Sequence, residues 1–348
     1  MNIKLKHYNE LDGVRAVAVI MVMFFHFFQN IDSSSSIIKL SLFGKTGVSL
    51  FFVLSGFLIT RILLNTKEKT SYFKSFYTRR ALRIFPLYFL FLFIYYFIFP
   101  LVSDWHLASF SEQIWYWTFT QNFAMTFGWD NFGPNYYWSL AVEEHFYLFW
   151  PLILYYCPIK KIKWTVLFLC ILSFLTRVIL IKNNIEESLF TFARLDELAL
   201  GSFLAILERE NKLISSNSKK FFAAFIISLF PLFYLTFKNG SYSLLDNSIR
   251  HLVLGLVYTS FVAFIVSVDS KNRIKQLLNT HLFSFTGKIS YGLYVYHPTC
   301  FLIIHYYLKN TSIILSFILS FGLAYIISIL SYYFFEKRFL KLKNKFPN

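Results

Sequence analysis

Long apolar stretches alternate with short polar connections along the whole chain. Ten of these stretches approach the roughly 20 residues that a helix needs to cross the hydrocarbon core of a bilayer. The pattern predicts an all-α, polytopic membrane protein with about ten transmembrane helices, built as a single integral-membrane domain over residues 1–348. The predicted helices cover residues 13–30, 47–64, 84–102, 138–157, 163–182, 189–207, 220–237, 250–268, 282–306 and 312–335.

The amino-acid composition also indicates that most of the chain lies in a membrane. The chain is 56% hydrophobic and 22% aromatic, with a mean hydropathy of +0.52. Only 15% of its residues are charged, whereas a soluble domain carries about 25%. The first apolar stretch lacks a small-residue cleavage site and is followed by many others, so we interpret it as a retained helix and not as a signal peptide.

The basic residues are divided unequally between two sets of loops that alternate along the chain. One set holds 23 Lys and Arg residues and the other only five. Because cytoplasmic loops are enriched in Lys and Arg, we predict that both termini are cytoplasmic. The net charge of +16 is then explained by membrane orientation, and we predict no nucleic-acid partner. The basic set is 1–12, 65–83, 158–163, 208–220, 269–280 and 336–348, and the other set is 31–46, 103–137, 183–188, 238–250 and 307–311.

The first apolar stretch, LDGVRAVAVIMVMFFHFF, carries two ionisable residues, Arg15 and His26. Eleven helical steps place them within about 20° of one face and about 16 Å apart along the axis. An ionisable group inside a span costs roughly 2.5–3.5 kcal/mol and usually faces a cavity or a partner. Snorkelling explains Arg15 alone, and a packing hydrogen bond explains His26 alone. Their shared face favours a lined cavity.

A second group of cations lies in the segment YTRRALRIFP, next to the third apolar stretch. Arg80 and Arg83 are neighbours at the i, i+3 spacing of a helix. Clustered guanidiniums suit the oxygen atoms of phosphate groups, which makes these residues candidates for binding a phosphorylated ligand. The alternative is that they only mark a cytoplasmic loop.

Carboxylates and imidazoles lie nearer the predicted outer side. Glu143 is a candidate orienting group for His26, which would act as a base. His297 and Arg194 are candidate substrate-binding residues. A structural role for His297 and an internal ion pair of Arg194 with Asp196 are the competing interpretations. No spacing typical of a metal site occurs, and we predict no metal.

Six motifs in this order resemble those of the acyltransferase-3 family of bacterial integral-membrane O-acyltransferases. His145 departs from the pattern, because the family often has Gln at that position. The motifs are YNELDGVRAVAVIMVMFFHF with Arg15 and His26, GVSLFFVLSGFLIT, FYTRRALRIFPLYF with Arg80 and Arg83, YYWSLAVEEHFYLFWP with Glu143, ISYGLYVYHP with His297, and YYFFEKRFLK.

The resemblance implies an O-acyltransferase of the bacterial cytoplasmic (inner) membrane with an acyl-coenzyme A donor, most often acetyl-coenzyme A. It implies that Arg15, His26, Arg80 and Arg83 are needed for activity. We therefore predict His26 and Glu143 as catalytic residues, the three arginines as donor-binding residues, and the hydroxyl of an extracytoplasmic glycan, such as a surface polysaccharide or O-antigen, as acceptor.

Several alternatives stay open at this point. His26 acts either as a base or as a covalent acyl carrier, and the acyl group is acetyl, succinyl or longer. Tryptophans in the 103–137 connection either stack on sugars or anchor the chain at the membrane interface. A transporter of a small molecule or glycan intermediate and an inactive partner of a glycan assembly complex are the two other functional classes. The resemblance also leads us to expect that the chain acts alone or with separate partners.

Overall fold

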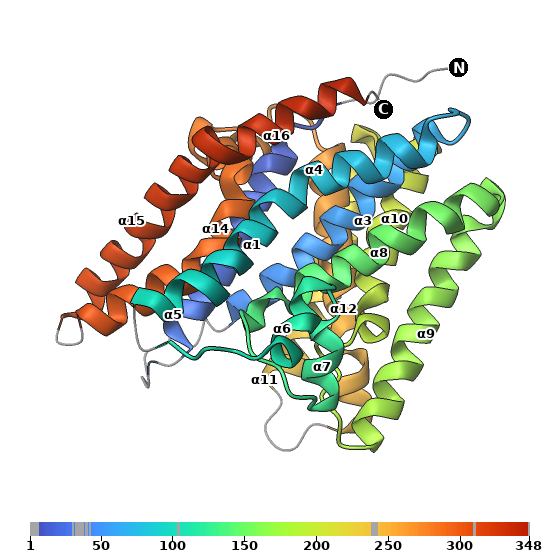
Figure 1. Cartoon of the computed structure of the whole chain (residues 1–348). Helices are drawn as coiled ribbons and strands as arrows, with labels where there is room; N and C mark the ends of the chain where they lie inside the picture. Colours follow the sequence, from blue (N-terminus) through green and yellow to red (C-terminus); the bar gives the residue numbers. More distant parts are fainter. Residues whose placement is uncertain are drawn as a thin grey trace.

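The computed structural model describes residues 7–29, 31, 38, 41, 43–102, 105–237, 243–308 and 311–346. In these ranges the chain is helical and contains no strand, which confirms the predicted all-α class. A long helix covers each of the ten apolar stretches (Figure 1). They are α1 (Glu10–Phe28), α3 (Gly47–Thr66), α4 (Tyr72–Phe93, continued by a π-helical turn at Ile94–Ile98 and by α5 at Phe99–Val102), α8 (Trp138–Tyr156), α9 (Ile162–Lys182), α10 (Thr191–Arg209), α11 (Ser218–Phe237), α12 (Leu244–Ser267), α14 (His281–Tyr307) and α15 (Ile313–Ser331).

Within the described ranges, seven helices are long and apolar enough to cross a membrane, which supports a multi-pass membrane protein. The helices at the other three predicted stretches, α8, α10 and α14, carry Glu143, Arg194 and His297, respectively. The total of ten spans and the cytoplasmic position of the termini stay predictions.

Helix α3 forms the centre of the bundle. It packs against α1, α8, α10 and α12, while α1 packs along α14. Helices α9 and α15 lie at two edges of the bundle (Figure 1), and α9, α11 and α15 expose large apolar side chains. A polar solvent would disfavour such faces, so they are the surfaces that lipid covers.

The loops predicted to share one side of the membrane do lie at one end of the bundle. Lys275, on the short helix α13 (Arg273–Leu278), forms an ion pair of 2.8 Å with Glu10. Arg61 is paired with Glu208 in the same region. Together with a 2.8 Å hydrogen bond from the Tyr8 hydroxyl to Glu208, these contacts join three of the basic segments, 1–12, 208–220 and 269–280, as a common side requires.

The described part of the aromatic 103–137 connection, from Trp105 onward, folds back onto the bundle. It forms α6 (Phe110–Trp117), α7 (Gln121–Phe127) and a 3-10 turn, η3 (Asn135–Tyr137). The Tyr88 hydroxyl on α4 donates to the Tyr116 carbonyl at 2.8 Å, and the Gln121 amide donates to the Tyr137 carbonyl at 2.8 Å. These bonds fix the start of α8.

Two glycines allow α3 and α10 to approach each other closely. A Cβ atom on Gly56 would lie 1.9 Å from the Leu198 carbonyl oxygen, and one on Gly201 would lie 2.1 Å from the Val53 carbonyl oxygen. Both obstacles are backbone atoms, so a side chain at either position would force the helices apart. Small residues at such crossings are typical of helix packing in membranes.

We expect Gly201→Ala to destabilise the protein by about 1–3 kcal/mol, because the added methyl group overpacks this crossing. Gly322→Ala on α15 is the matched control, since a Cβ atom at that position would meet nothing within 4 Å, and alanine favours a helix. Thermal unfolding of the detergent-solubilised variants measures the difference. Equal melting temperatures for Gly201→Ala and Gly322→Ala would contradict this interpretation of the crossing.

Candidate active site

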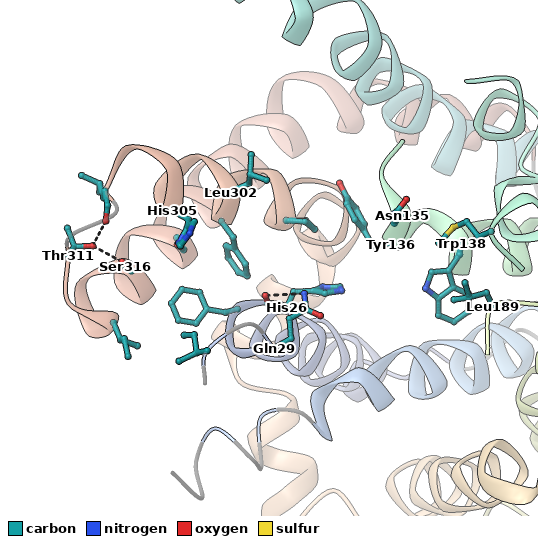
Figure 2. A pocket seen from close by; sticks show the side chains of 18 residues that line it. His26, Gln29, Asn135, Tyr136, Trp138, Leu189, Leu302, His305, Thr311 and Ser316 are labelled. Carbon is teal, nitrogen blue, oxygen red and sulfur yellow. Dashed lines mark hydrogen bonds between the residues drawn. The ribbon is translucent and has the colours of Figure 1, made fainter. Parts of the chain in front are cut away.

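A pocket of about 710 Å³, here called the histidine pocket, opens between the end of α1, the turn η3, the second half of α14 and the start of α15 (Figure 2). Its volume falls in the range of small-molecule sites. Aromatic, amide, imidazole and hydroxyl groups share the lining, which suits a ligand with both apolar faces and hydroxyl groups. The polar and aromatic lining includes His26, Gln29, Asn135, Tyr136, Trp138 and His305.

His26 lines this pocket and is held by His297. The His26 Nδ1 and His297 Nε2 atoms are 2.8 Å apart, and the two rings are stacked with centroids 5.0 Å apart. The other ring nitrogen of His297, Nδ1, lies 2.7 Å from the Leu293 carbonyl oxygen. His297 is 0% exposed, so its ring has no freedom to change these partners.

These contacts determine where the protons lie in a neutral histidine pair. The Leu293 carbonyl can only accept, so His297 Nδ1 carries the hydrogen and His297 Nε2 presents a lone pair. His26 Nδ1 must then donate to His297 Nε2. As a result, His26 Nε2 keeps its lone pair and is the ring nitrogen able to accept a proton from a ligand.

A second, smaller cavity of about 90 Å³, here called the arginine cavity, lies further along the same helices. Arg15 from α1 and Arg80 and Arg83 from α4 line it together. Arg15 is bound to Asp12 at 3.0 Å. Within the described part of the chain, neither Arg80 nor Arg83 forms an ion pair, so their donors face the cavity without a protein carboxylate bound to them.

Glu143 also lines the arginine cavity. Its carboxylate accepts a hydrogen bond of 2.5 Å from the Ser55 hydroxyl, which in turn accepts one of 3.0 Å from the Tyr147 hydroxyl. The Arg80 guanidinium lies over the Tyr147 ring, 5.5 Å from its centroid. Glu143 is thus part of the cationic site, where it partly offsets the positive charge.

Hydrogen-bonded side chains separate the two spaces. The Tyr294 hydroxyl donates to the Tyr136 carbonyl at 2.5 Å and lies 2.5 Å from the Ser139 hydroxyl. The Tyr136 hydroxyl donates to the Val295 carbonyl at 2.9 Å. Ser139 and Tyr294 line the arginine cavity, whereas Tyr136 lines the histidine pocket. We call Tyr136, Ser139 and Tyr294 the partition.

The structure groups the predicted residues differently from the sequence hypothesis. Arg15, Arg80, Arg83 and Glu143 share one cavity, and His26 lies in the other. Among the described residues, the hydrogen-bond partner of the His26 ring is His297 and not Glu143.

The tryptophans of the 103–137 connection also lie elsewhere. The indole that lines the histidine pocket is Trp138 at the start of α8, while Trp105, Trp115, Trp117 and Trp129 are absent from its lining.

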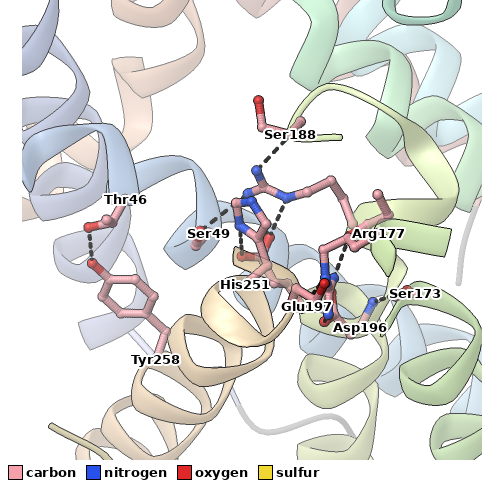
Figure 3. A network of polar contacts seen from close by, with 12 residues as sticks. Thr46, Ser49, Ser173, Arg177, Ser188, Asp196, Glu197, His251 and Tyr258 are labelled. Atoms are coloured by element: carbon pink, nitrogen blue, oxygen red, sulfur yellow. Dashed lines mark hydrogen bonds and ion pairs between the residues drawn. The ribbon is translucent and has the colours of Figure 1, made fainter. Parts of the chain in front are cut away.

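Arg194 lines neither cavity. It donates to Ser49 and Glu197, which belong to the buried polar network shown in Figure 3. Its guanidinium pairs with Glu197 at 2.8 Å and lies 5.3 Å from the ring centroids of both Phe52 and Trp138. The expected pair of Arg194 with Asp196 is replaced by the pair with Glu197. Arg194 therefore supports the back of Trp138, whose ring faces the histidine pocket.

Asp196 instead binds Arg177 of α9 at 2.8 Å, and both side chains are 0% exposed. The Arg177 guanidinium also donates to the Ala193 carbonyl at 2.5 Å and to the Ser248 carbonyl at 2.6 Å. Arg177 thereby connects α9, α10 and α12. Sequence reasoning missed this residue, although an arginine inside the apolar stretch SFLTRVIL is itself a signal of an internal partner.

Comparison with known proteins gives a consistent family of relatives. A family model described as an acyltransferase domain matches residues 8–333. A Staphylococcus aureus (strain COL) protein named "Putative O-acetyltransferase" is 29% identical over 97% of this chain and 58% of its own length. The O-acetyltransferase OatA of S. aureus (strain NCTC 8325 / PS 47) is 27% identical over 94% of this chain and 56% of its own length. The chain thus spans little more than half of these relatives, and no solved structure matches it.

We expect Arg177→Met to destabilise the protein by about 3–5 kcal/mol, because it leaves the Asp196 carboxylate buried without a partner. Removing both charges, in Arg177→Met with Asp196→Leu, should recover much of this loss. Lys212→Gln, at an exposed pair with Glu210, is the control and should change stability by less than about 1 kcal/mol. Thermal unfolding in detergent tests this, and a single variant as stable as the double variant would show that the pair carries no such penalty.

Proposed function

Because the chain belongs to the acyltransferase-3 family, we propose that it is a membrane-bound O-acyltransferase. It transfers an acyl group, acetyl in the first instance, from cytoplasmic acyl-coenzyme A to a hydroxyl of an extracytoplasmic glycan. One observation carries the proposal: a cationic cavity and a histidine-lined pocket are stacked along the same helices, α1, α8 and α14. The printed names of the staphylococcal relatives, which refer to O-acetyltransferases, support acetyl as the group.

The arginine cavity is the proposed donor side. Arg80 and Arg83 are one helical turn apart, and Arg15 contributes a third guanidinium to the same space. Guanidiniums form charge-assisted, bidentate hydrogen bonds with phosphate oxygens, which fits the phosphates of coenzyme A. The Glu143 carboxylate offsets part of the positive charge of the cavity. It also accepts the hydrogen bond that holds the Ser55 hydroxyl, which we propose lies along the path of the acyl arm.

The histidine pocket is the proposed acceptor side. Its aromatic rings suit the apolar faces of sugar rings, and its amide and hydroxyl groups suit sugar hydroxyls. Trp138 and Tyr136, both at the pocket wall, are the rings we propose for stacking. His305 and Gln29 are available for hydrogen bonds.

His26 Nε2 is the proposed general base. It removes the proton from the acceptor hydroxyl while that oxygen attacks the thioester carbonyl carbon. The carbon–sulfur bond then breaks, coenzyme A leaves as the thiolate, and the proton on His26 Nε2 returns to the sulfur. His297, positioned by the Leu293 carbonyl, holds the His26 ring in the tautomer that this step requires.

The donor arm must pass the partition for this reaction to occur. The thioester begins on the arginine side, and His26 lies on the other side of Tyr136, Ser139 and Tyr294. Each of the three hydroxyl contacts joins two helical elements, η3–α8 and α14. A small separation of these elements is therefore the movement that we propose admits the acyl arm.

The test of the proposed function is the transfer of labelled acetyl from acetyl-coenzyme A in membranes of cells that make a surface glycan. We expect His26→Ala to lower the transfer by a factor of about 10² or more, because general base catalysis contributes about 10²–10⁴. His281→Ala, an exposed histidine at the start of α14, is the matched control and should retain wild-type transfer.

Each outcome has a clear meaning at matched protein levels. Equal transfer by His26→Ala and wild type would remove His26 from the chemistry. If wild-type membranes transfer no label, the donor or the enzyme assignment fails, and export of a small molecule or glycan intermediate becomes the next function to measure.

We expect His297→Ala to lower kcat by about tenfold to a hundredfold, with little change in the KM for acetyl-coenzyme A. The reason is that His297 orients the His26 ring and does not itself react. Hydrogen-bond partners orient metal-binding histidines in the same way. His297→Gln, whose amide oxygen can accept from His26 Nδ1, should recover part of the rate. A raised KM with unchanged kcat would instead make His297 a substrate-binding residue, which was the prediction from sequence.

A further inference from the structure

The group of cations at the arginine cavity extends beyond its lining toward the end of the chain. After α15 the chain continues through a π-helical turn (Tyr332–Glu336), α16 (Lys337–Leu342) and the short turn η7 (Lys343–Lys345). Both α16 and η7 pack against α4, the helix that carries Arg79, Arg80 and Arg83. The segment that follows α15 therefore lies against α4, beside the proposed donor site.

Arg79 fixes this turn in place. Its Nη1 donates to the Lys343 carbonyl at 2.9 Å and to the Phe346 carbonyl at 2.8 Å. These are backbone acceptors at the end of a helix, which otherwise lack intrahelical donors. The guanidinium of Arg79 is thus used to hold the turn, and the position of Lys343 is set by its own main chain.

The Lys343 side chain is available for a ligand. It is half-buried, whereas Lys345 in the same turn is exposed. Within the described ranges, the Lys343 ammonium donates to no protein acceptor and forms no ion pair. It lies within electrostatic range of four guanidiniums, those of Arg15, Arg79, Arg80 and Arg83.

Among the described residues, carboxylates balance the positive charge of this cluster only in part. Four carboxylates lie near the five cations: Asp12 bound to Arg15, Glu143 and Glu144 near Arg80, and Glu336 near Arg83. Like charges at short distance repel, most strongly where water is partly excluded. An anionic group with several oxygens would relieve this repulsion, and a phosphate is such a group.

The arginine cavity is too small to hold a whole nucleotide. Its volume is about 90 Å³. Sites for whole cofactors occupy about 300–1,000 Å³. The nucleotide end of a donor must therefore lie outside the cavity, on the side where Lys343 extends the line of cations.

We propose that Lys343, held in place by Arg79, is a further phosphate-binding residue that takes the phosphates of a nucleotide of the coenzyme A type outside the arginine cavity. The inference rests on the proposed function for the identity of the donor. It adds Lys343 to a group of cations otherwise contributed by α1 and α4.

The test is coenzyme A binding by the full chain in phosphatidylcholine nanodiscs, followed by titration calorimetry. We expect Lys343→Gln to weaken binding by about tenfold, the effect of losing one charge-assisted hydrogen bond. Lys343→Arg keeps the charge and should bind within about twofold of wild type. Lys345→Gln removes an equal charge from an exposed position two residues away and should bind as wild type does.

The outcomes separate this inference from the proposed function. If wild type binds coenzyme A and Lys343→Gln binds it equally well, Lys343 is not part of the site, while the proposed function stands. If wild type binds no coenzyme A, both are overturned.

Anionic lipid is the other source of phosphate at this position. If Lys343→Gln weakens the binding of phosphatidylglycerol vesicles but leaves coenzyme A affinity unchanged, the residue serves a lipid headgroup and the inference is overturned. A steeper loss of coenzyme A affinity with salt in wild type than in Lys343→Gln would support a direct contact with phosphate.

Discussion

An ionisable side chain inside an apolar helix bundle must have either an internal partner or a polar cavity, and the arrangement of this protein follows from that constraint. Helices α9, α11 and α15 expose large apolar side chains. Helices α8, α10 and α14 carry Glu143, Arg194, Asp196 and His297. Residues of α8 and α14 line the two cavities together with residues of α1 and α4, whereas the charged residues of α10 are paired inside the buried polar network.

The buried arginines divide into two kinds according to what they bind. Arg177 and Arg194 are fully engaged by carboxylates and carbonyls, and they join helices without facing either cavity. Arg80 and Arg83 face a cavity and form no ion pair with the described protein groups. The first kind stabilises the packing, whereas the second keeps its donors for an anion. This difference, and not the mere presence of arginine in an apolar segment, identifies a binding group.

The hydrophobic pattern of the sequence was sufficient to predict features that depend on a single helix. It located the ten apolar stretches and the common face of Arg15 and His26. It could not show that His26 meets His297, because the two lie 271 residues apart and their contact depends on how α1 and α14 pack. It also linked His26 with Glu143, whereas packing places Glu143 beside Ser55 and the arginines. The start of α4 at Tyr72, well before the predicted stretch, was hidden because its first turns are basic and polar.

The partition resolves a conflict that any such site in a membrane faces. The proposed donor site and the proposed acceptor site must exchange an acyl group, yet a continuous water-filled path between them would also conduct protons and ions. The hydroxyl of Tyr294 is fixed by the Tyr136 carbonyl, and the Tyr136 hydroxyl is fixed by the Val295 carbonyl. Hydroxyls bound to main-chain carbonyls do not relay protons freely, and the rings that carry them fill the space between the cavities. The partition therefore explains how two polar cavities can be stacked along three helices while the bundle stays closed in this state.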